Sequence, residues 1–288
     1  MKKIDLTSKR KKLEALLEEF RPEPCYYSTK KGQIRLVSDE VKRGERLIDD
    51  AQKELDKLDE EISQPYSDFS NKDKGKAFEF LKLLGLHFCP YCNINDVYAI
   101  FDENGEKICR PDIDHFLPKS KYPEKQLDLE NLVPSCLMCN QRLKGTTPFS
   151  NTKYLNPYKE DFDSIMEIKL DLIGANYLSE DNFKIIFEKK QRVGQKKTKS
   201  WAKKVERAEN NIDVFKLEER YQYYKDEIIP IMRKIDFYKH KKRQEIEKLF
   251  DQNYCIPFRK MLFPEENCDI NNTRLGKLKK DVIKAFLK

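Results

Sequence analysis

Two Cys-x-x-Cys pairs constrain this chain of 288 residues more than any other feature of its sequence. The first pair is Cys89 and Cys92, and the second is Cys136 and Cys139. Each pair puts two sulfurs on one tight turn, and the four thiolates together complete the tetrahedron that Zn²⁺ accepts in a closed structural site. The gap between the pairs is longer than the roughly 15–20 residues of compact zinc ribbons. The sequence therefore predicts one structural zinc that joins two distant segments.

Two other interpretations of these cysteines are open. They can be four unrelated buried thiols, or they can form disulfides. The chain shows no signal peptide and its remaining cysteines are scattered, which fits a reducing cytosol better than an oxidising compartment. We therefore expect a cytoplasmic protein whose other thiols are ordinary and have no metal spacing, namely Cys25, Cys109, Cys255 and Cys268.

A β-hairpin is predicted between the two pairs. Residues 97–101 are β-prone, and the Asn-Gly step at residues 104–105 is the strongest short signal for a tight hairpin turn. Residues 107–113 form the expected return strand. This strand brings Asp114 and His115 to its end.

A second short strand and a helix complete the segment. Residues 129–133 are predicted as a strand that carries Asn131, and residues 136–144 as a short helix that Gly145 ends. Polar groups from each element are expected to face inward. Two chemistries are therefore interleaved here: a four-thiolate metal knot, and a set of carboxylate, imidazole and carboxamide groups.

The polar residues of this segment resemble the HNH endonuclease motif. Their order is Asp-His, then Asn-Leu, then Cys-x-x-Cys-Asn, with a closing Lys-Gly at residues 144–145. The flanking Cys-x-x-Cys halves are similar to the zinc-knotted branch of that family. The sequence Cys-Pro-Tyr-Cys followed by Asp-His-Phe-Leu-Pro-Lys-Ser most resembles the HNH proteins of Septu-type and retron-associated antiphage systems. The resemblance implies a ββα-metal fold over residues 89–145.

Three side chains of the motif have the chemistry that phosphodiester hydrolysis needs, which is an activated water and a cation that absorbs negative charge. His115 titrates near neutrality and can take a proton from water. Asp114 and the side-chain oxygen of Asn140 are hard ligands suited to Mg²⁺ or Mn²⁺. Two protein ligands leave coordination positions open for phosphate oxygens and water.

The resemblance assigns the same roles to these residues. It implies that His115 is the general base and that Asp114 and Asn140 hold the catalytic Mg²⁺ or Mn²⁺. It also implies that Asn131 braces the loop after the histidine. Asn140 stands where the family name implies a histidine, and asparagine is a common family variant there. Asp112 shares a predicted strand face with Asp114, and it is either a neighbour of the metal ligands or simply exposed.

The three histidines of the chain have different expected roles. His115 lies in the motif, and its alternatives are a structural histidine or a zinc ligand that replaces one cysteine. His87 lies just before Cys89 and is the better candidate for a place near the zinc. His240 lies in a basic helix and is expected to be solvated.

Charge and hydropathy limit the class of protein. Lys and Arg outnumber Asp and Glu by 57 to 50, and the net charge of +7 agrees in sign with a nucleic-acid partner. No apolar run approaches the ~20 residues of a membrane span, so no membrane association is expected. A charged fraction of 37% and only 9 glycines favour a mainly helical chain. We predict an α+β fold, mostly helical, with a small zinc-stapled ββα-metal nuclease core and helical extensions at both ends.

Three regions are expected along the chain. Residues 1–85 form an N-terminal helical region, residues 86–160 the HNH nuclease core with its zinc knot, and residues 161–288 the C-terminal strands and basic helices. N-terminal helices are predicted at residues 1–20, with a cap at Thr7 or Ser8, at residues 38–62, and after a cap formed by Ser70 and Asp73. The heptad repeat over residues 38–62 suits a coiled coil with another chain or, as we favour, a helix pair within this chain.

The C-terminal region has less specific signals. The alternation of apolar and polar residues predicts strands at residues 165–172 and 183–187. Helices are predicted at residues 205–225, 228–250 and 273–288. The tail helix is basic and amphipathic, so it can dock on the core or on a partner. Residues 189–204 are the most basic stretch and contain the only tryptophan, Trp201. Phosphate contact and a solvated surface are equally open there.

Two functions from different classes follow from the sequence. The first is a metal-dependent HNH endonuclease that cleaves DNA, with RNA left open as a substrate. The resemblance to defence proteins implies an effector role beside an ATPase subunit of the same system. The second is a zinc-stabilised nucleic-acid-binding or adaptor subunit with a vestigial nuclease site. The intact motif argues against the second function, because it retains Asp114, His115, Asn131 and Asn140.

Overall fold

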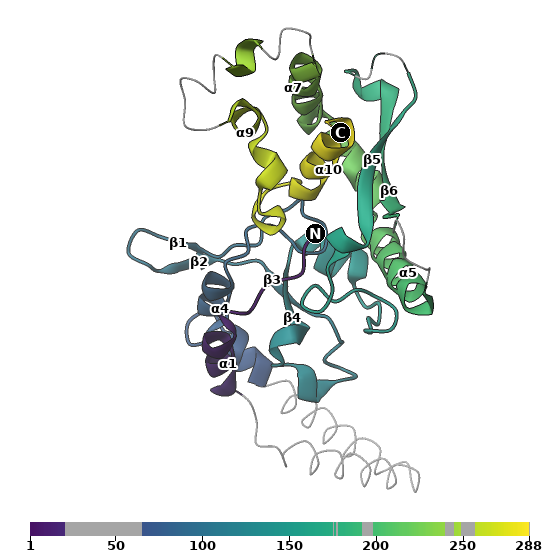
Figure 1. The fold of residues 1–288 in the computed structure, drawn as a ribbon. Coiled ribbons are helices and arrows are strands. Elements are labelled where there is room, and N and C mark those ends of the chain that lie inside the picture. The colour runs from purple at the N-terminus through teal and green to yellow at the C-terminus, as the bar shows by residue number, and fades with distance from the viewer. Residues whose placement is uncertain are drawn as a thin grey trace, which may run out of the picture.

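The computed structural model describes residues 1–20, 65–174, 176, 178–191, 198–239, 245–248 and 257–287. In these residues helices dominate, as Figure 1 shows. The strands form three separate two-stranded antiparallel sheets. The predicted α+β class, mostly helical with a small core that four cysteines can staple, is confirmed. The predicted helix over residues 38–62, with its heptad repeat, and His240 lie outside the described residues.

Two N-terminal helices carry the expected apolar faces. They are α1 (Arg10–Glu18) and α4 (Ala77–Leu84), and both begin later than the sequence predicted. Neither has a side-chain cap; Thr7 instead donates its hydroxyl to Asp5 over 2.6 Å. Gly85 ends α4 with a φ of +63°, a left-handed conformation that glycine adopts without strain. Helix α4 therefore leads directly into the first cysteine turn.

The central segment contains the first two sheets. Strand β1 (Ile100–Phe101) pairs with β2 (Lys107–Cys109) in the predicted hairpin. Strand β3 (Asp112–His115) pairs with β4 (Leu132–Ser135), so that Asp114 lies opposite Val133 and His115 opposite Leu132. The end of β3 is thus fixed by a second strand, which is short and fully buried.

Three predicted boundaries in this segment are corrected by the structure. The single return strand over residues 107–113 is wrong, because Pro111 lies between β2 and β3 and has no N–H for a ladder bond. Asn131 lies in no strand; it ends the 3₁₀ helix η3 (Leu129–Asn131) that precedes β4. The helix after Cys136 is present as the π-helix η4 (Met138–Lys144), with Gly145 at its end.

The C-terminal region begins with the two predicted strands, which are β5 (Met166–Leu172) and β6 (Phe183–Lys189). The structure pairs them in antiparallel fashion along their full length. The helices that follow are α5 (Lys199–Val214), α6 (Leu217–Tyr221), α7 (Ile229–Lys239), α9 (Phe258–Leu262) and α10 (Gly276–Phe286). The remaining short helices are η2 (Pro123–Lys125), η5 (Phe162–Ser164), η6 (Glu180–Asn182), η7 (Gln222–Glu227), η8 (Pro264–Asn267) and η9 (Ile270–Asn272). The predicted unbroken helix over residues 205–225 is wrong, because the backbone turns at Lys216 (φ +48°) between α5 and α6.

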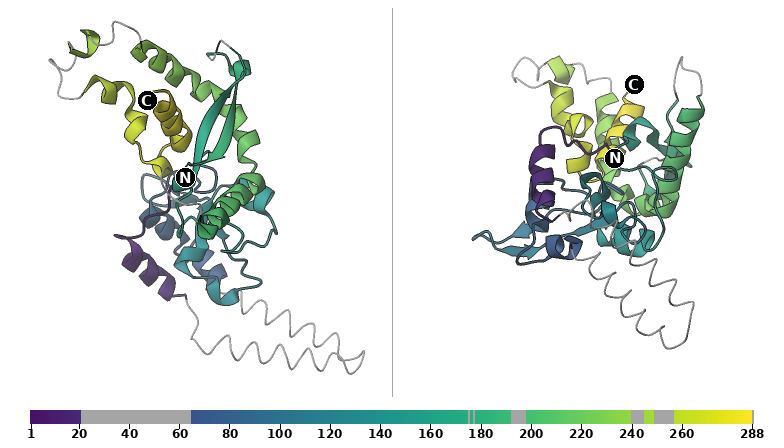
Figure 2. Two further views of the ribbon diagram at one scale, coloured as in Figure 1. Left: turned by 45° about the vertical axis from the view of Figure 1, so that its right-hand side comes forward. Right: turned by 90° about the horizontal axis from the view of Figure 1, so that it is seen from below.

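One hydrophobic core joins these regions, with buried side chains from Leu13 in α1, Leu132 in β4 and Ile283 in α10. The predicted tail helix docks on the chain itself, since Asp281 of α10 accepts the backbone N–H of Ile168 over 2.8 Å. Figure 2 shows the N-terminal end beside these C-terminal elements in both of its views. Among the described residues, no helix is both long and apolar enough to cross a membrane.

Candidate active site and metal centre

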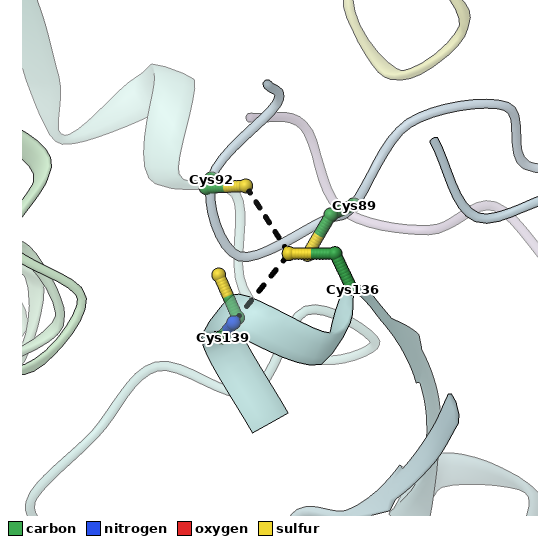
Figure 3. A group of neighbouring side chains, drawn as sticks. All are labelled: Cys89, Cys92, Cys136 and Cys139. Atoms are coloured by element: carbon green, nitrogen blue, oxygen red, sulfur yellow. Dashed lines mark hydrogen bonds between the residues drawn. The ribbon is translucent and has the colours of Figure 1, made fainter. Parts of the chain in front are cut away.

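The four cysteines gather where the turn after α4 meets the start of η4 (Figure 3). All four are buried, and their sulfur atoms lie within 4.8 Å of one another. The Sγ atoms of Cys92 and Cys136 are 3.9 Å apart. A tetrahedron with Zn–S bonds of roughly 2.3 Å requires sulfurs ~3.8 Å apart. The structure therefore brings both pairs together as one set that can hold a zinc ion: Cys89, Cys92, Cys136 and Cys139.

Polar groups from outside the two pairs support this knot. Arg220 of α6 donates to Cys139 Sγ over 3.3 Å, and Asn95 donates to Cys136 Sγ over 3.3 Å. The next residue of α6, Tyr221, donates its hydroxyl to the carbonyl of Cys92 over 2.8 Å. No local pattern in the sequence points to Arg220, which lies 81 positions after Cys139. The C-terminal region is thus part of the environment of the sulfurs.

The thiols differ in the ease with which they ionise. Burial raises the pKa values of Cys89 and Cys139 well above the ordinary value. Hydrogen bonds to the other three thiols, first to that of Cys139, hold the pKa of Cys136 well below it. Four neighbouring buried thiolates would repel one another, and a divalent cation removes that repulsion. His87 does not join the described group of cysteines; its ring lies against Tyr98 with ring centroids 6.2 Å apart.

His115, the predicted general base, lies at the end of β3. Its Nε2 atom lies 3.0 Å from the backbone carbonyl oxygen of Gln126. A carbonyl only accepts hydrogen bonds, so Nε2 carries the hydrogen and Nδ1 of the neutral ring is left as an acceptor. Burial lowers the pKa of His115 to about 4, so the expectation that this histidine titrates near neutrality is wrong. The imidazole is therefore neutral near pH 7, which is the state that a proton acceptor needs.

Asn131 lies at the centre of the loop that follows the histidine. It is 3% exposed, and its Oδ1 accepts the N–H of Leu117 over 2.6 Å. Its Nδ2 donates to the carbonyls of Leu117 and Lys125, at 3.1 and 2.9 Å. The loop from residue 117 to residue 125 is thereby closed around one carboxamide. Because the next residue, Gln126, supplies the acceptor of His115, the loop and the imidazole are fixed together.

Asp114 is buried and fully engaged by protein donors. Lys144 Nζ lies 2.6 and 2.7 Å from its two carboxylate oxygens, and the Tyr91 hydroxyl donates to Oδ2 over 2.7 Å. The side chains of Lys144 and Asp114 are only 4% and 6% exposed. Lys144 also donates to the backbone carbonyl of His115 over 2.6 Å. The motif contains Lys144 and Tyr91, but its order of residues alone reveals neither of their bonds to Asp114.

Asp112, two residues earlier, is the carboxylate that meets Asn140. Asn140 Nδ2 donates to Asp112 Oδ2 over 3.1 Å, and Gln141 Nε2 donates to the same oxygen over 2.9 Å. Strand alternation puts Asp112 and Asp114 on one face of β3, as predicted, and η4 packs along that face. Asn140 lies near the start of this helix and Lys144 ends it, so each of the two meets a different carboxylate.

The basic stretch at residues 189–204 is described only in part, because residues 192–197 lie outside the described ranges. Lys190 lies 3.5 Å from Asp163, and Lys204 lies 3.8 Å from Glu160. Trp201 is 8% exposed and belongs to the hydrophobic core. Lys199 and Lys203 are exposed at the start of α5. Lys189 at the end of β6 is exposed as well, so these three lysines are the described cations of the stretch that are open to a phosphate contact.

Comparison with known proteins agrees with the residues above. Residues 89–145 match the family model of the HNH endonucleases, and this segment contains the cysteine knot, β3, β4 and η4. The protein therefore carries an HNH endonuclease domain. It is also similar to the Septu protein PtuB of Bacillus thuringiensis, with 32% identity over 98 residues.

The extent of these similarities is limited. The match to PtuB covers 33% of this chain and 35% of that protein, so the chain spans about a third of the length of this relative. No solved structure gives a significant match. The predicted resemblance to HNH proteins of the Septu type is confirmed by the HNH match over residues 89–145 and by the similarity of 98 residues to PtuB.

Proposed function

We propose that this protein is a metal-dependent HNH endonuclease that hydrolyses phosphodiester bonds in DNA. The observation that carries the proposal is the state of His115, which lies within the segment that matches the HNH family. One ring nitrogen is bonded to a backbone carbonyl, so the other is an acceptor for a proton from water. A neutral, fixed imidazole at the end of a short strand is the arrangement that a general base requires.

His115 takes the proton from the attacking water through Nδ1. Asn131 holds the loop that carries the Gln126 carbonyl, and this carbonyl keeps the hydrogen on Nε2. Lys144 holds the backbone of His115 through its carbonyl oxygen. Each of these contacts exists before substrate binds, so little reorganisation is needed at the moment of reaction.

A divalent cation, Mg²⁺ or Mn²⁺, would supply the charge that phosphate and the leaving oxygen need. Asn140 offers a hard oxygen ligand, and β3 offers two carboxylates. The resemblance favours Asp114, whereas the contact geometry favours Asp112, which already lies against Asn140. Asp114 already accepts from Lys144 and Tyr91. These oxygen donors suit Mg²⁺ or Mn²⁺. Either Asp112 or Asp114 would be the carboxylate ligand beside Asn140.

The four cysteines would hold one structural Zn²⁺ in a closed site. Their sulfurs have the spacing of a tetrahedral set and leave no position for substrate. Zinc would join the turn after α4 to the start of η4, which directly follows β4, the partner strand of β3. Its part in the reaction is to keep the geometry of the site.

One observation favours a second candidate function. Both oxygens of Asp114 are within hydrogen-bond distance of Lys144, an arrangement that also suits a site which no longer binds metal. The protein would then be a zinc-stabilised nucleic-acid-binding or adaptor subunit. The neutral, oriented imidazole of His115 weighs against this candidate, since a vestigial site does not need it.

Cleavage of supercoiled plasmid with Mg²⁺ or Mn²⁺, and with EDTA as control, separates the two candidates. The enzyme requires added metal, stops with EDTA and retains its zinc. The adaptor cuts nothing under any of these conditions. Asp112→Asn and Asp114→Asn, each titrated with Mn²⁺, then identify the metal carboxylate, because only the ligand variant shifts the metal dependence. RNA offered in the same assay tests the preference for DNA.

We further propose that the nuclease is the effector of an antiphage defence complex. The similarity to the Septu protein PtuB supports this role. The resemblance to HNH proteins of antiphage systems implies an ATPase subunit of the same system as the expected partner. Light scattering of the complex purified from its native operon tests the association. A fully active monomer that gains nothing from neighbouring gene products would contradict it.

A further inference from the structure

Tyr66 lies against the end of β3, although it precedes His115 by 49 positions in the chain. Its ring meets the imidazole of His115 edge to face, with centroids 4.4 Å apart and planes at 69°. Its hydroxyl donates to the carbonyl of Ile113 over 3.2 Å. One side chain therefore holds two points of the same strand, two residues apart.

Both contacts are of a kind that fixes orientation. Burial raises the pKa of Tyr66 to about 12, so the hydroxyl stays protonated and remains a donor to Ile113. Edge-to-face aromatic pairs have a preferred geometry beyond the area that they bury. Gln126 holds the Nε2 end of the imidazole, and the ring of Tyr66 limits its tilt.

Lys119 lies on the same tyrosine. Its Nζ is 5.4 Å from the centroid of the Tyr66 ring, within the range of a cation–π contact. The residue is exposed, and it follows His115 by four positions. An exposed ammonium held next to a general base is well placed to bind a phosphate oxygen of a nucleic acid.

We propose that Tyr66 is a positioning residue of the nuclease site, which orients the His115 imidazole and holds Lys119 for a substrate phosphate. The inference rests on the proposed function and extends it, because it assigns the base a support outside the HNH motif and assigns the substrate a binding residue. Tyr66 acts through His115 and Lys119 and takes no chemical step itself.

Nitrogen-15 NMR of the histidine side chains in the full chain tests the orienting role without any need for activity. The chain has only three histidines, so the spectrum can be assigned by single substitutions. Tyr66→Leu is expected to shift the ring-nitrogen signals of His115 and to populate a second tautomer. The matched control is Tyr98→Leu, which removes the tyrosine ring from His87 and is expected to move the His87 signals alone. Unchanged His115 signals in folded Tyr66→Leu would overturn the proposal.

Kinetics of plasmid cleavage separate the two parts of the proposal. Tyr66→Leu is expected to lower kcat about 10- to 100-fold, because small misplacements of a catalytic group cost rate. It is also expected to raise KM, because Lys119 loses the ring that holds it. Tyr66→Phe keeps the ring and loses only the hydroxyl, so its loss of kcat is expected to be smaller. A parental kcat in folded Tyr66→Leu would contradict the orienting role.

Lys119→Gln keeps the proposal testable if Tyr66→Leu does not fold. It is expected to raise KM and to lower the slope of log affinity against log salt by about 1, while the His115 signals stay in place. An unchanged KM and salt slope would overturn the substrate role of Lys119. If the parent protein cuts nothing yet Tyr66→Leu still shifts the His115 signals, the proposed nuclease function fails while the positioning contact stands.

Discussion

The cysteine knot and the base site lie in the same segment of the chain, yet they are built in opposite ways. In the knot, four identical side chains converge on one point and are incomplete without a cation between them. In the base site, each functional side chain already has a protein partner: His115 has Gln126, and Asp114 has Lys144. The knot therefore carries the shape of the domain, whereas the base site can lose its chemistry and keep its shape.

The largest expected effect comes from the knot. Cys139→Ser is expected to lose zinc and most of the soluble protein, because the free energy of metal binding in such a site is free energy of folding. Elemental analysis and the soluble yield measure both. The matched control is Cys109→Ser, an exposed thiol outside the knot, which should retain zinc and yield. Folded Cys139→Ser without zinc would show that the knot does not carry the shape of the domain.

The buried ion pair of the base site gives the next effect. Lys144→Met leaves the Asp114 carboxylate buried without its cation, and removal of one partner of a buried pair costs about 3–5 kcal/mol. Chemical denaturation measures the loss of unfolding free energy. The control is Lys277→Met, a buried lysine paired with Asp163 and Asp281 far from His115 in the chain. It should lose similar stability and still cleave when folded. Equal free energies of unfolding for Lys144→Met and the parent would contradict the account.

A smaller effect is expected at the rim of the knot. Arg220→Gln removes the donor to Cys139 Sγ and should weaken zinc binding about 10- to 100-fold, the usual cost of losing a partner of a metal ligand. Zinc release to a chromogenic chelator gives the affinity. Arg207→Gln is the control, because Arg207 binds Glu160 and Asn151 and does not contact the sulfurs. A zinc affinity of Arg220→Gln equal to that of the parent would show that the knot does not need the hydrogen bond from Arg220.

The cysteine knot and the base site also differ in how much of each could be predicted from the sequence. The spacing of Cys-x-x-Cys is a local property, so it was enough to predict which four cysteines meet. The strands β5 and β6 and the α10 tail were also predicted, because alternating and amphipathic patterns indicate which side chains are buried. These elements need no knowledge of the rest of the fold.

The partners in the base site could not be predicted in this way. Asn140 contacts Asp112 because of the π-helical geometry of η4 and its position against β3. No short sequence motif predicts a π-helical turn. Tyr66 reaches His115 across 49 positions, and Arg220 reaches Cys139 across 81. The break at Lys216 was missed because a positive φ at a lysine goes against its local preference and is imposed by packing.

The smallest expected effect is on DNA affinity and leaves both sites intact. Reversing charge at Lys199 and Lys203 should lower the salt slope of DNA binding by about 1 for each phosphate that the variant no longer binds, with cleavage at saturating DNA unchanged. The control reverses Lys11 and Lys12, which are exposed on α1, and so makes the same change in net charge. Equal slopes in the two variants would assign the basic stretch to the solvated surface.

The central claim is that His115 supplies the chemistry and the knot supplies the shape. His115→Ala, assayed for plasmid cleavage with Mg²⁺ beside zinc content, melting temperature and DNA binding, tests it most directly. Loss of a general base costs about 10²–10⁴-fold in rate, so cleavage should fall by this amount while the other three properties stay close to those of the parent. Cleavage at the parental rate by His115→Ala would contradict the account and would place the nuclease activity elsewhere.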